Sequence, residues 1–263
     1  MINSQKRKYK IKKKRSFLKS RFFWLALLII VGLALIADLI LFSPFLQIND
    51  ISVSGNERIP AAEIQNFIWP EVEKSFPFGL KTQNLILADP LSIKTRLLEK
   101  FLLIDELNVK KLWPKSLVVE IKERKTVSLW CWETNCFALD KKGVIFETAS
   151  EDQAGLVIKS KQPKNEISTG KKVMEEKILE QILFIRQTMS QKAKIEAREF
   201  TLFENDQRLN AKTNEGWEVF FDLKGDVNWS LVELELVLEK ELPLEKRGSL
   251  EYIDLRFSKV YYK

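Results

Sequence analysis

The catalytic chemistry available to this sequence is limited by its residue types. The 263 residues include no histidine, which removes the commonest general base and the commonest transition-metal ligand. A serine nucleophile would then need a lysine as its base. Ser16 and Lys19 have the S-x-x-K spacing, but they lie in a basic N-terminal segment and no supporting motif accompanies them. We therefore expect no enzymatic activity, no cofactor and no small-molecule substrate.

Three acidic residues and two cysteines could form other kinds of site. Glu233, Glu235 and Glu239 could be imagined as metal ligands, but on a helix they are more simply explained as a solvated face, so we expect no metal site. Cys131 and Cys136 are the only cysteines, and they flank a four-residue segment between two expected strands. Facing positions across such a loop can meet disulfide geometry. We expect a disulfide here, with two free thiols as the alternative.

These residues belong to a chain with one long apolar segment near its start. Residues 22–42 contain a single charge, Asp38, and as a helix they would extend about 31 Å, close to the thickness of a bilayer's hydrocarbon core. The apolar run is longer than that of a cleaved signal peptide, and no small-x-small cleavage site follows it. We therefore expect an uncleaved transmembrane helix at residues 22–42.

The distribution of charge predicts the orientation of this helix. Residues 1–21 contain ten Lys or Arg and no acid, and such basic flanks stay on the cytoplasmic side of the membrane. Subtracting these ten charges from the formal +7 leaves −3 on the other 242 residues, so the basic character belongs to the tail and we expect no binding to nucleic acid. We expect a cytoplasmic tail at 1–21 and residues 43–263 outside the cytoplasm, where disulfides persist.

Residues 45–124 have the pattern of a small α+β module. Ile59-Pro60 and Asp89-Pro90 each place proline in the first turn of a helix, where its missing N–H costs nothing, and Pro70 is expected to end the earlier helix. Trp113-Pro114 separates two alternating stretches, which predicts a hairpin. The expected order is strand, helix, helix, strand and strand, at residues 45–53, 60–70, 90–101, 104–112 and 117–122.

Residues 125–263 predict a second domain, a mixed β-sheet with two helices. Helices are expected at 173–190 and 226–241, the second capped by Asp226 and with Trp229, Val232 and Leu236 on one side. Most tryptophans, including Trp113, are expected in the core, with an exposed contact as the alternative for Trp113 because it precedes Pro114 in a turn. Strands are expected within 127–146 and at 156–158, 195–203, 208–213, 217–223 and 252–257. The fold class is therefore α+β behind a single transmembrane helix.

Several short motifs follow the apolar segment in a characteristic order. They are VSGN at 53–56, LLIDELNVKKLWPKSLVVEIKER at 102–124, FALDKKGVIF at 137–146, and GSLEYIDLRFSKVYYK at 248–263, which contains a YxDLR strand. In this order, behind a basic tail and one anchor, the chain resembles the FtsQ and DivIB family of bacterial cell-division proteins. The resemblance implies a POTRA domain at 45–124 and the family's C-terminal β domain at 125–263.

The resemblance also implies a function. It suggests a bitopic scaffold of the division machinery in the plasma (inner) membrane at the septum. Such a scaffold links early and late division proteins by binding single-pass partners of the FtsB and FtsL type, called DivIC in DivIB-containing organisms. A membrane-anchored extracytoplasmic enzyme or polypeptide-handling chaperone is the alternative, because POTRA modules also occur in transport proteins.

The last strand is the expected partner-binding site. From Tyr252 to Phe257 apolar and polar residues alternate, residues 260–263 could extend the strand to the chain end, and an uncovered strand edge offers unpaired N–H and C=O groups to a partner. By position, the resemblance singles out Arg256, Phe257 and Tyr261 as partner contacts, with Arg256 meeting an acidic residue and Phe257 filling an apolar pocket. Tyr252, in the same strand, is the fourth expected contact. The alternative is that Phe257 is ordinary core and Arg256 a surface charge.

Overall fold

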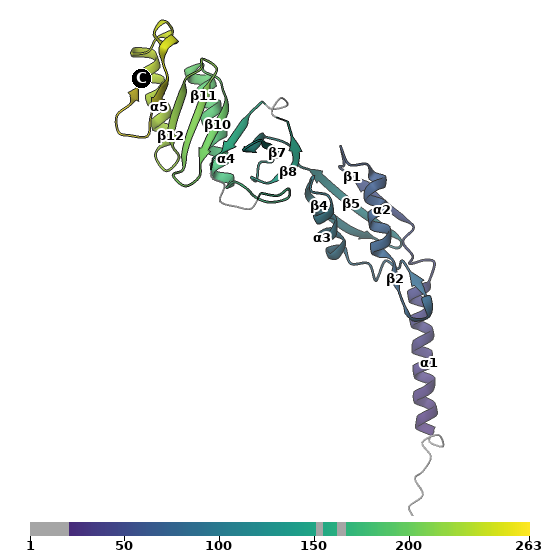
Figure 1. The fold of residues 1–263 in the computed structure, drawn as a ribbon. Coiled ribbons are helices and arrows are strands. Elements are labelled where there is room, and N and C mark those ends of the chain that lie inside the picture. Colours follow the sequence, from purple (N-terminus) through teal and green to yellow (C-terminus); the bar gives the residue numbers. More distant parts are fainter. Residues whose placement is uncertain (1–20, 151–154, 162–166) are drawn as a thin grey trace, which may run out of the picture. The chain divides into compact units, whose positions relative to one another are not determined.

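The computed structural model describes residues 21–150, 155–161 and 167–263 (Figure 1). The basic tail up to residue 20, including Ser16 and Lys19, lies outside the described residues. The chain divides into two compact units. Unit 1 is the chain up to Ser54 with Ala61–Ile93 and Val109–Val119, and unit 2 is Gly55–Pro60, Lys94–Asn108 and Glu120–Lys263. This division does not follow the expected domain boundary after residue 124, which stays a prediction.

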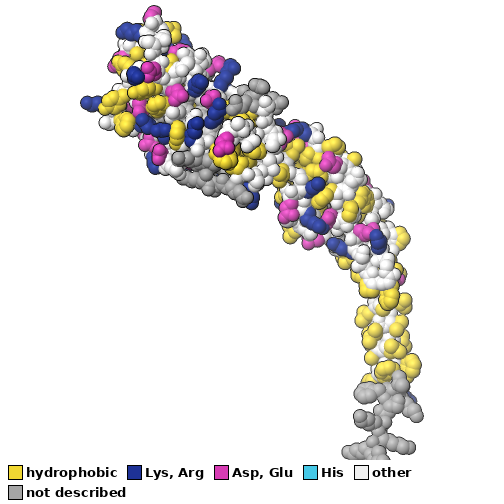
Figure 2. Space-filling model, in the orientation of Figure 1, with side chains coloured by type: hydrophobic (Ala, Val, Ile, Leu, Met, Phe, Trp, Pro, Cys, Tyr) yellow, Lys and Arg dark blue, Asp and Glu magenta, His cyan; other side chains and the backbone are white. Residues whose placement is uncertain are grey.

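Helix α1, Arg21–Phe42, begins unit 1 and is long and apolar enough to cross a membrane. None of its residues is buried, and Figure 2 shows hydrophobic side chains along it. At about 1.5 Å per residue, its 22 residues extend roughly 33 Å, enough for a hydrocarbon core of about 30 Å. The expected apolar helix is therefore present, and it includes Arg21, the first described residue.

The region after α1 contains a three-stranded sheet in the order β1-β5-β4, with two helices. Its elements are β1 Asp50–Ser54, α2 Ala61–Val72, α3 Pro90–Lys100, β4 Ile104–Leu112 and β5 Ser116–Glu123. This is the predicted β-α-α-β-β order. Ile64, Ile68 and Val72 form the buried face of α2, because residues three or four apart share one side of a helix.

Two details of this region differ from the prediction. Pro70 lies inside α2 and does not end it. A proline in the last turn removes a single helical hydrogen bond, and the burial of Val72 favours continuing the helix to that residue. A short hairpin also follows α2, made of β2 Lys74–Ser75 and β3 Lys81–Thr82. Strands of two residues have too little periodicity to be recognised in the sequence.

Unit 2 contains a nine-stranded mixed sheet in the order β14-β13-β12-β11-β10-β9-β6-β7-β8. Helices α4, Glu176–Thr188, and α5, Val227–Lys240, pack with the sheet in one continuous apolar core. The pairs β9–β6, β9–β10 and β12–β13 are parallel, and the other neighbours are antiparallel. The strands are β6 Ser128–Trp132, β7 Asn135–Leu139, β8 Ile145–Ala149, β9 Val157–Ser160, β10 Ala197–Phe203, β11 Arg208–Thr213, β12 Glu218–Asp222, β13 Tyr252–Asp254 and β14 Tyr261–Tyr262.

The FALDKKGVIF motif forms the turn between β7 and β8. The Asp140 carboxylate accepts hydrogen bonds from the backbone N–H groups of Lys142 and Val144, each at 2.9 Å. Gly143 has a φ of 79°, and a Cβ there would lie 2.0 Å from the Met174 carbonyl oxygen. Only glycine fits this close approach without distortion, which explains its place in the motif.

The tryptophans divide between core and surface. Trp130 and Trp217 are among the largest fully buried side chains, as expected. Trp113 and Trp229 are exposed, each with 57% of its surface accessible. The expectation that Trp113 packs in the core is therefore wrong, because the turn after β4 carries its side chain away from the sheet.

A candidate partner-binding edge

The outer edge of the large sheet is formed by the last residues of the chain. Strand β14 pairs antiparallel with β13, with Tyr262 opposite Ile253 and Tyr261 opposite Asp254. Lys263 and Tyr252 exchange hydrogen bonds, with N to O distances of 3.2 and 3.3 Å. Bonded and non-bonded pairs alternate in such a ladder, so the N–H and C=O of Tyr262 point to the outer side. Among the described strands, none pairs with that side.

This arrangement corrects the predicted course of the last strand. The strand does not run from Tyr252 to Phe257, because it ends at Asp254. There the Asp254 carboxylate accepts a hydrogen bond from the Arg256 backbone N–H at 3.1 Å, a local bond that favours a turn over a continued strand. Residues 261–262 consequently fold back and cover β13. The open edge therefore belongs to β14 and not to the YxDLR strand.

Asp254 and Arg256 form a tight ion pair beside this edge. The Arg256 guanidinium donates to both carboxylate oxygens, at 2.8 Å from Nε and 2.5 Å from Nη2. Burial opposes ionisation of Asp254, but the hydrogen bonds from Arg256 outweigh it and lower the pKa of the carboxyl below its ordinary value. The same pairing raises the pKa of Arg256. Arg256 is thus already paired within its own chain, and any acidic partner residue would have to share it.

Aromatic rings surround this ion pair. The guanidinium carbon of Arg256 lies 5.4 Å from the ring centroids of both Phe220 and Phe257. Phe220 is stacked on Tyr252 at 5.2 Å, and Phe257 meets Tyr261 edge to face at 5.8 Å. The structure therefore brings the four predicted site residues, Tyr252, Arg256, Phe257 and Tyr261, together at one edge.

The residues of this predicted site differ in solvent exposure. Phe257 and Tyr261 have 56% and 53% of their surfaces accessible, whereas Tyr252 is half-buried against Phe220. The alternative that Phe257 is ordinary core is therefore wrong. Large exposed aromatic side chains beside an open strand are typical of protein interfaces.

Helix α5 carries an exposed apolar stripe that we did not predict as part of a binding site from the sequence. Asp226 caps the helix as expected, accepting a hydrogen bond from the Trp229 N–H at 3.1 Å. The buried face, however, is made of Val227, Leu231, Leu234 and Leu238. Trp229, Val232 and Leu236 are exposed. The i, i+3, i+7 spacing of these three residues is the sequence signal for the stripe, because it marks one continuous side of a helix.

The stripe and the sheet edge belong to the same C-terminal segment. The hydroxyl of Tyr262 donates a hydrogen bond to the Glu241 carboxylate at 3.1 Å, just after α5 ends. Tyr262 is thus directed toward the helix, whereas Tyr261, its neighbour in the strand, is directed to the opposite face. A partner strand along β14 would therefore contact residues from both faces of the sheet.

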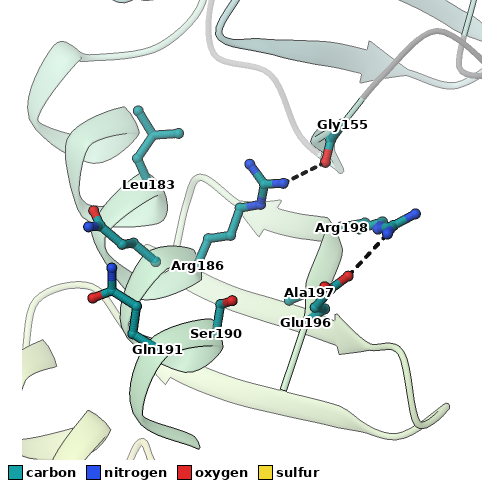
Figure 3. Close-up of a pocket in the computed structure, with 9 residues that line it drawn as sticks. Gly155, Leu183, Arg186, Ser190, Gln191, Glu196, Ala197 and Arg198 are labelled. Carbon is teal, nitrogen blue, oxygen red and sulfur yellow. Dashed lines mark hydrogen bonds and ion pairs between the residues drawn. The ribbon is translucent and has the colours of Figure 1, made fainter. Parts of the chain in front are cut away.

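A surface pocket elsewhere in unit 2 offers no comparable assignment. It lies beside α4 and β10, and Figure 3 shows that Arg186 reaches across it to the Gly155 carbonyl, an N–O distance of 2.9 Å. Arg198 is paired with Glu196 at 3.1 Å. Both cations therefore already serve contacts of the chain itself. Within the described residues, no group of three or more His, Cys, Asp or Glu could hold a metal ion.

Cys131 and Cys136 face each other across β6 and β7. Their sulfur atoms lie 2.04 Å apart and their Cα atoms 4.1 Å apart. The expected disulfide stays a prediction, which counting free thiols in the unreduced protein tests.

Part of the chain matches a family of known proteins. Residues 46–124 match the family model described as POTRA domain, FtsQ-type. No curated protein matches the chain. The match confirms the POTRA domain that the sequence motifs predict, and it supports the resemblance to the FtsQ and DivIB family.

Proposed function

We propose, from the FtsQ-type POTRA domain at residues 46–124, that this protein is a bitopic scaffold of the bacterial division machinery without catalytic activity of its own. Helix α1 anchors it in the plasma membrane, with the N-terminus in the cytoplasm and the folded part outside, at the septum. It binds small single-pass partners of the FtsB, FtsL or DivIC type and so links early and late division proteins.

The edge of β14 supports the partner-binding part of this proposal. The strand has an outer side without a partner among the described strands, flanked by exposed Phe257 and Tyr261. A free strand edge is a hazard for aggregation unless a partner covers it, and addition of a partner strand is a common recognition mode. Main-chain hydrogen bonds would supply affinity, and the aromatic side chains would supply specificity.

The test is co-purification of the full chain with its partner from membranes of the native host. We expect the FtsB- or DivIC-type protein to co-purify with the unmodified chain and to be lost when Phe257→Lys and Tyr261→Lys are combined. Central aromatic residues of an interface contribute about 2 kcal/mol or more each, so each of the two changes should lower the affinity by about thirtyfold or more.

Phe184→Lys serves as the matched control, because Phe184 is also an exposed aromatic residue of unit 2 but lies on α4. Circular dichroism and thermal unfolding of each variant measure folding. Loss of the partner from a normally folded double variant, with binding retained by Phe184→Lys, supports the proposal. Unchanged binding contradicts it, and so does collapse of the fold, because collapse would show that the two rings stabilise the domain itself.

A further inference from the structure

The loop between β2 and β3 presents apolar side chains that the rest of unit 1 does not cover. It runs from Phe76 to Leu80, closed by a 2.8 Å hydrogen bond from the Phe76 N–H to the Leu80 carbonyl. Phe78 is fully exposed, at 102% of its reference surface, and Leu80 is 51% exposed. The loop thus displays a phenylalanine that makes almost no contact with its own chain.

The backbone of Phe78 adds a second observation. Its φ is 67°, in the left-handed region that bulky residues rarely occupy. Such strain persists where the surrounding structure imposes it, and it concentrates at functional sites. Here the strained conformation holds the ring away from the protein.

Hydrogen bonds join the β2–β3 hairpin and the residues just after it to the end of helix α1. Figure 1 shows β2 next to this end of the helix. The Thr82 hydroxyl donates to the Leu41 carbonyl at 2.8 Å, and the Asn84 side-chain amide donates to the Ile40 and Leu41 carbonyls at 2.7 and 3.1 Å. These are carbonyls that a helix leaves unpaired in its last turn. The rings of Phe42 and Phe76 also meet edge to face at 6.1 Å.

These contacts fix the level of the loop relative to a membrane. A helix of about 33 Å fills a hydrocarbon core of about 30 Å, so its last residues lie at the boundary between acyl chains and headgroups. Because the hairpin is bonded to Ile40 and Leu41, its apolar tip lies beside the same boundary. The apolar surface of α1 therefore continues onto this loop.

We propose that the Phe76–Leu80 loop inserts into the membrane interface and acts as a second contact with lipid. Phe78 and Leu80 enter the boundary between headgroups and acyl chains, as apolar side chains of interfacial segments do. Lys74 and Lys81 lie at the base of the hairpin, where cations meet anionic headgroups. Lys81 also pairs with Glu73 at 2.7 Å. Phe45, exposed three residues after α1, adds to the apolar surface that follows the helix.

The test uses the full chain in lipid nanodiscs with an environment-sensitive fluorophore on Leu80→Cys. Lipids carrying nitroxide groups near the headgroup quench a probe that lies at the interface. We expect strong quenching at Leu80→Cys. Glu63→Cys, an exposed position in the first turn of α2, should give little. The unsubstituted chain is treated with the same fluorophore as a control. It measures the background fluorescence from labelling of Cys131 and Cys136.

A probe on Leu35→Cys in the middle of α1 separates this proposal from the anchor on which it rests. Quenching of Leu35→Cys by acyl-chain nitroxides, without quenching of Leu80→Cys, overturns the loop proposal and leaves the anchor intact. No quenching at Leu35→Cys overturns both. A Leu80→Cys probe that is shielded from water but not quenched by lipid also contradicts the proposal, because it would show that a protein covers the loop.

Phe78→Ser in the labelled Leu80→Cys chain tests the ring itself. We expect the quenching to be lost in this variant and retained in a chain carrying Phe184→Ser, a change of an exposed ring in unit 2. Equal quenching with and without the Phe78 ring would show that the side chain does not enter the membrane.

Discussion

The paired charges of Asp254 and Arg256 show how a site residue can also hold its own segment in place. The sequence presents Arg256 as a free cation for an acidic partner, yet its guanidinium is bonded to both oxygens of Asp254. Asp254 is buried and could not ionise there at low cost without this partner. The pair therefore stabilises the turn that presents Phe257 and Tyr261.

The lowered pKa of Asp254 predicts a pH dependence of stability. A carboxyl whose folded pKa lies below its unfolded value of about 3.9 contributes stability above that value and loses it as the pH falls through the folded pKa. We expect the urea midpoint of the detergent-solubilised chain to fall as the pH is lowered below about 4. Asp254→Asn should lower the urea midpoint at neutral pH. It should also reduce the further fall of the midpoint as the pH is lowered.

Asp50→Asn, at an exposed position of β1, is the control for removal of one carboxylate. This change should leave the urea midpoint at neutral pH nearly unchanged. The fall of the midpoint below about pH 4 should also stay nearly the same. An Asp254→Asn chain with the same acid loss as the unmodified chain would contradict the role assigned to the ion pair.

At the scale of single elements, one buried carboxylate joins a loop to a strand. Glu123, at the end of β5, accepts hydrogen bonds from the backbone N–H groups of Glu57, Arg58 and Ile59, at 2.9 to 3.0 Å. Burial opposes its ionisation, but these three donors outweigh burial and lower its pKa. The loop follows Gly55, where a Cβ would lie 2.1 Å from the Ile121 carbonyl oxygen, so the VSGN motif and the end of β5 fit closely.

Glu123→Gln should therefore destabilise this region. The amide retains one acceptor oxygen but turns an N–H₂ group toward backbone donors, and an unsatisfied buried group costs about 1–3 kcal/mol. We expect the free energy of unfolding in urea to fall by that amount. Glu99→Gln, at an exposed position of α3, should change it by less than about 0.5 kcal/mol. Equal effects of the two changes would contradict the assigned role of Glu123.

The elements that the sequence predicts well are those with strong local signals. Proline in the first turn of α3 and the Asp226 cap of α5 marked helix starts correctly, because both depend on neighbouring backbone alone. The buried side of α5 was harder. Leu231, Leu234 and Leu238 have helical spacing, and so do Trp229, Val232 and Leu236, and only the position of the sheet decides which stripe is covered.

The structure places the predicted site residues near one another and corrects the course of the strand that carries them. Tyr252, Arg256, Phe257 and Tyr261 do lie together, but alternation in the sequence could not show that β13 ends at Asp254. That end depends on the bonds between Asp254 and Arg256, which compete with the strand. The β2–β3 hairpin was missed for a related reason, because its position depends on contacts with α1 more than 30 residues earlier, such as Thr82 with Leu41.

At the scale of the whole molecule, the proposed function depends on the orientation of the chain in the membrane. The ten basic residues before the anchor predict a cytoplasmic N-terminus. In intact cells, a cysteine at Lys12 should be shielded from an impermeant thiol reagent, and a cysteine at Lys161 should be labelled. Lys12 lies outside the described residues, whereas Lys161 is exposed after β9. The reverse pattern of labelling would contradict the proposed function.

The most direct test of partner binding concerns the backbone of β14. If a partner strand pairs with its outer side, the outward N–H of Tyr262 gains a hydrogen bond on binding. Hydrogen–deuterium exchange of the full chain, alone and with the FtsB- or DivIC-type protein of the host, measures this change. We expect exchange to slow in residues 260–263 of the complex. A complex that forms while exchange in these residues is unchanged would contradict binding at the β14 edge.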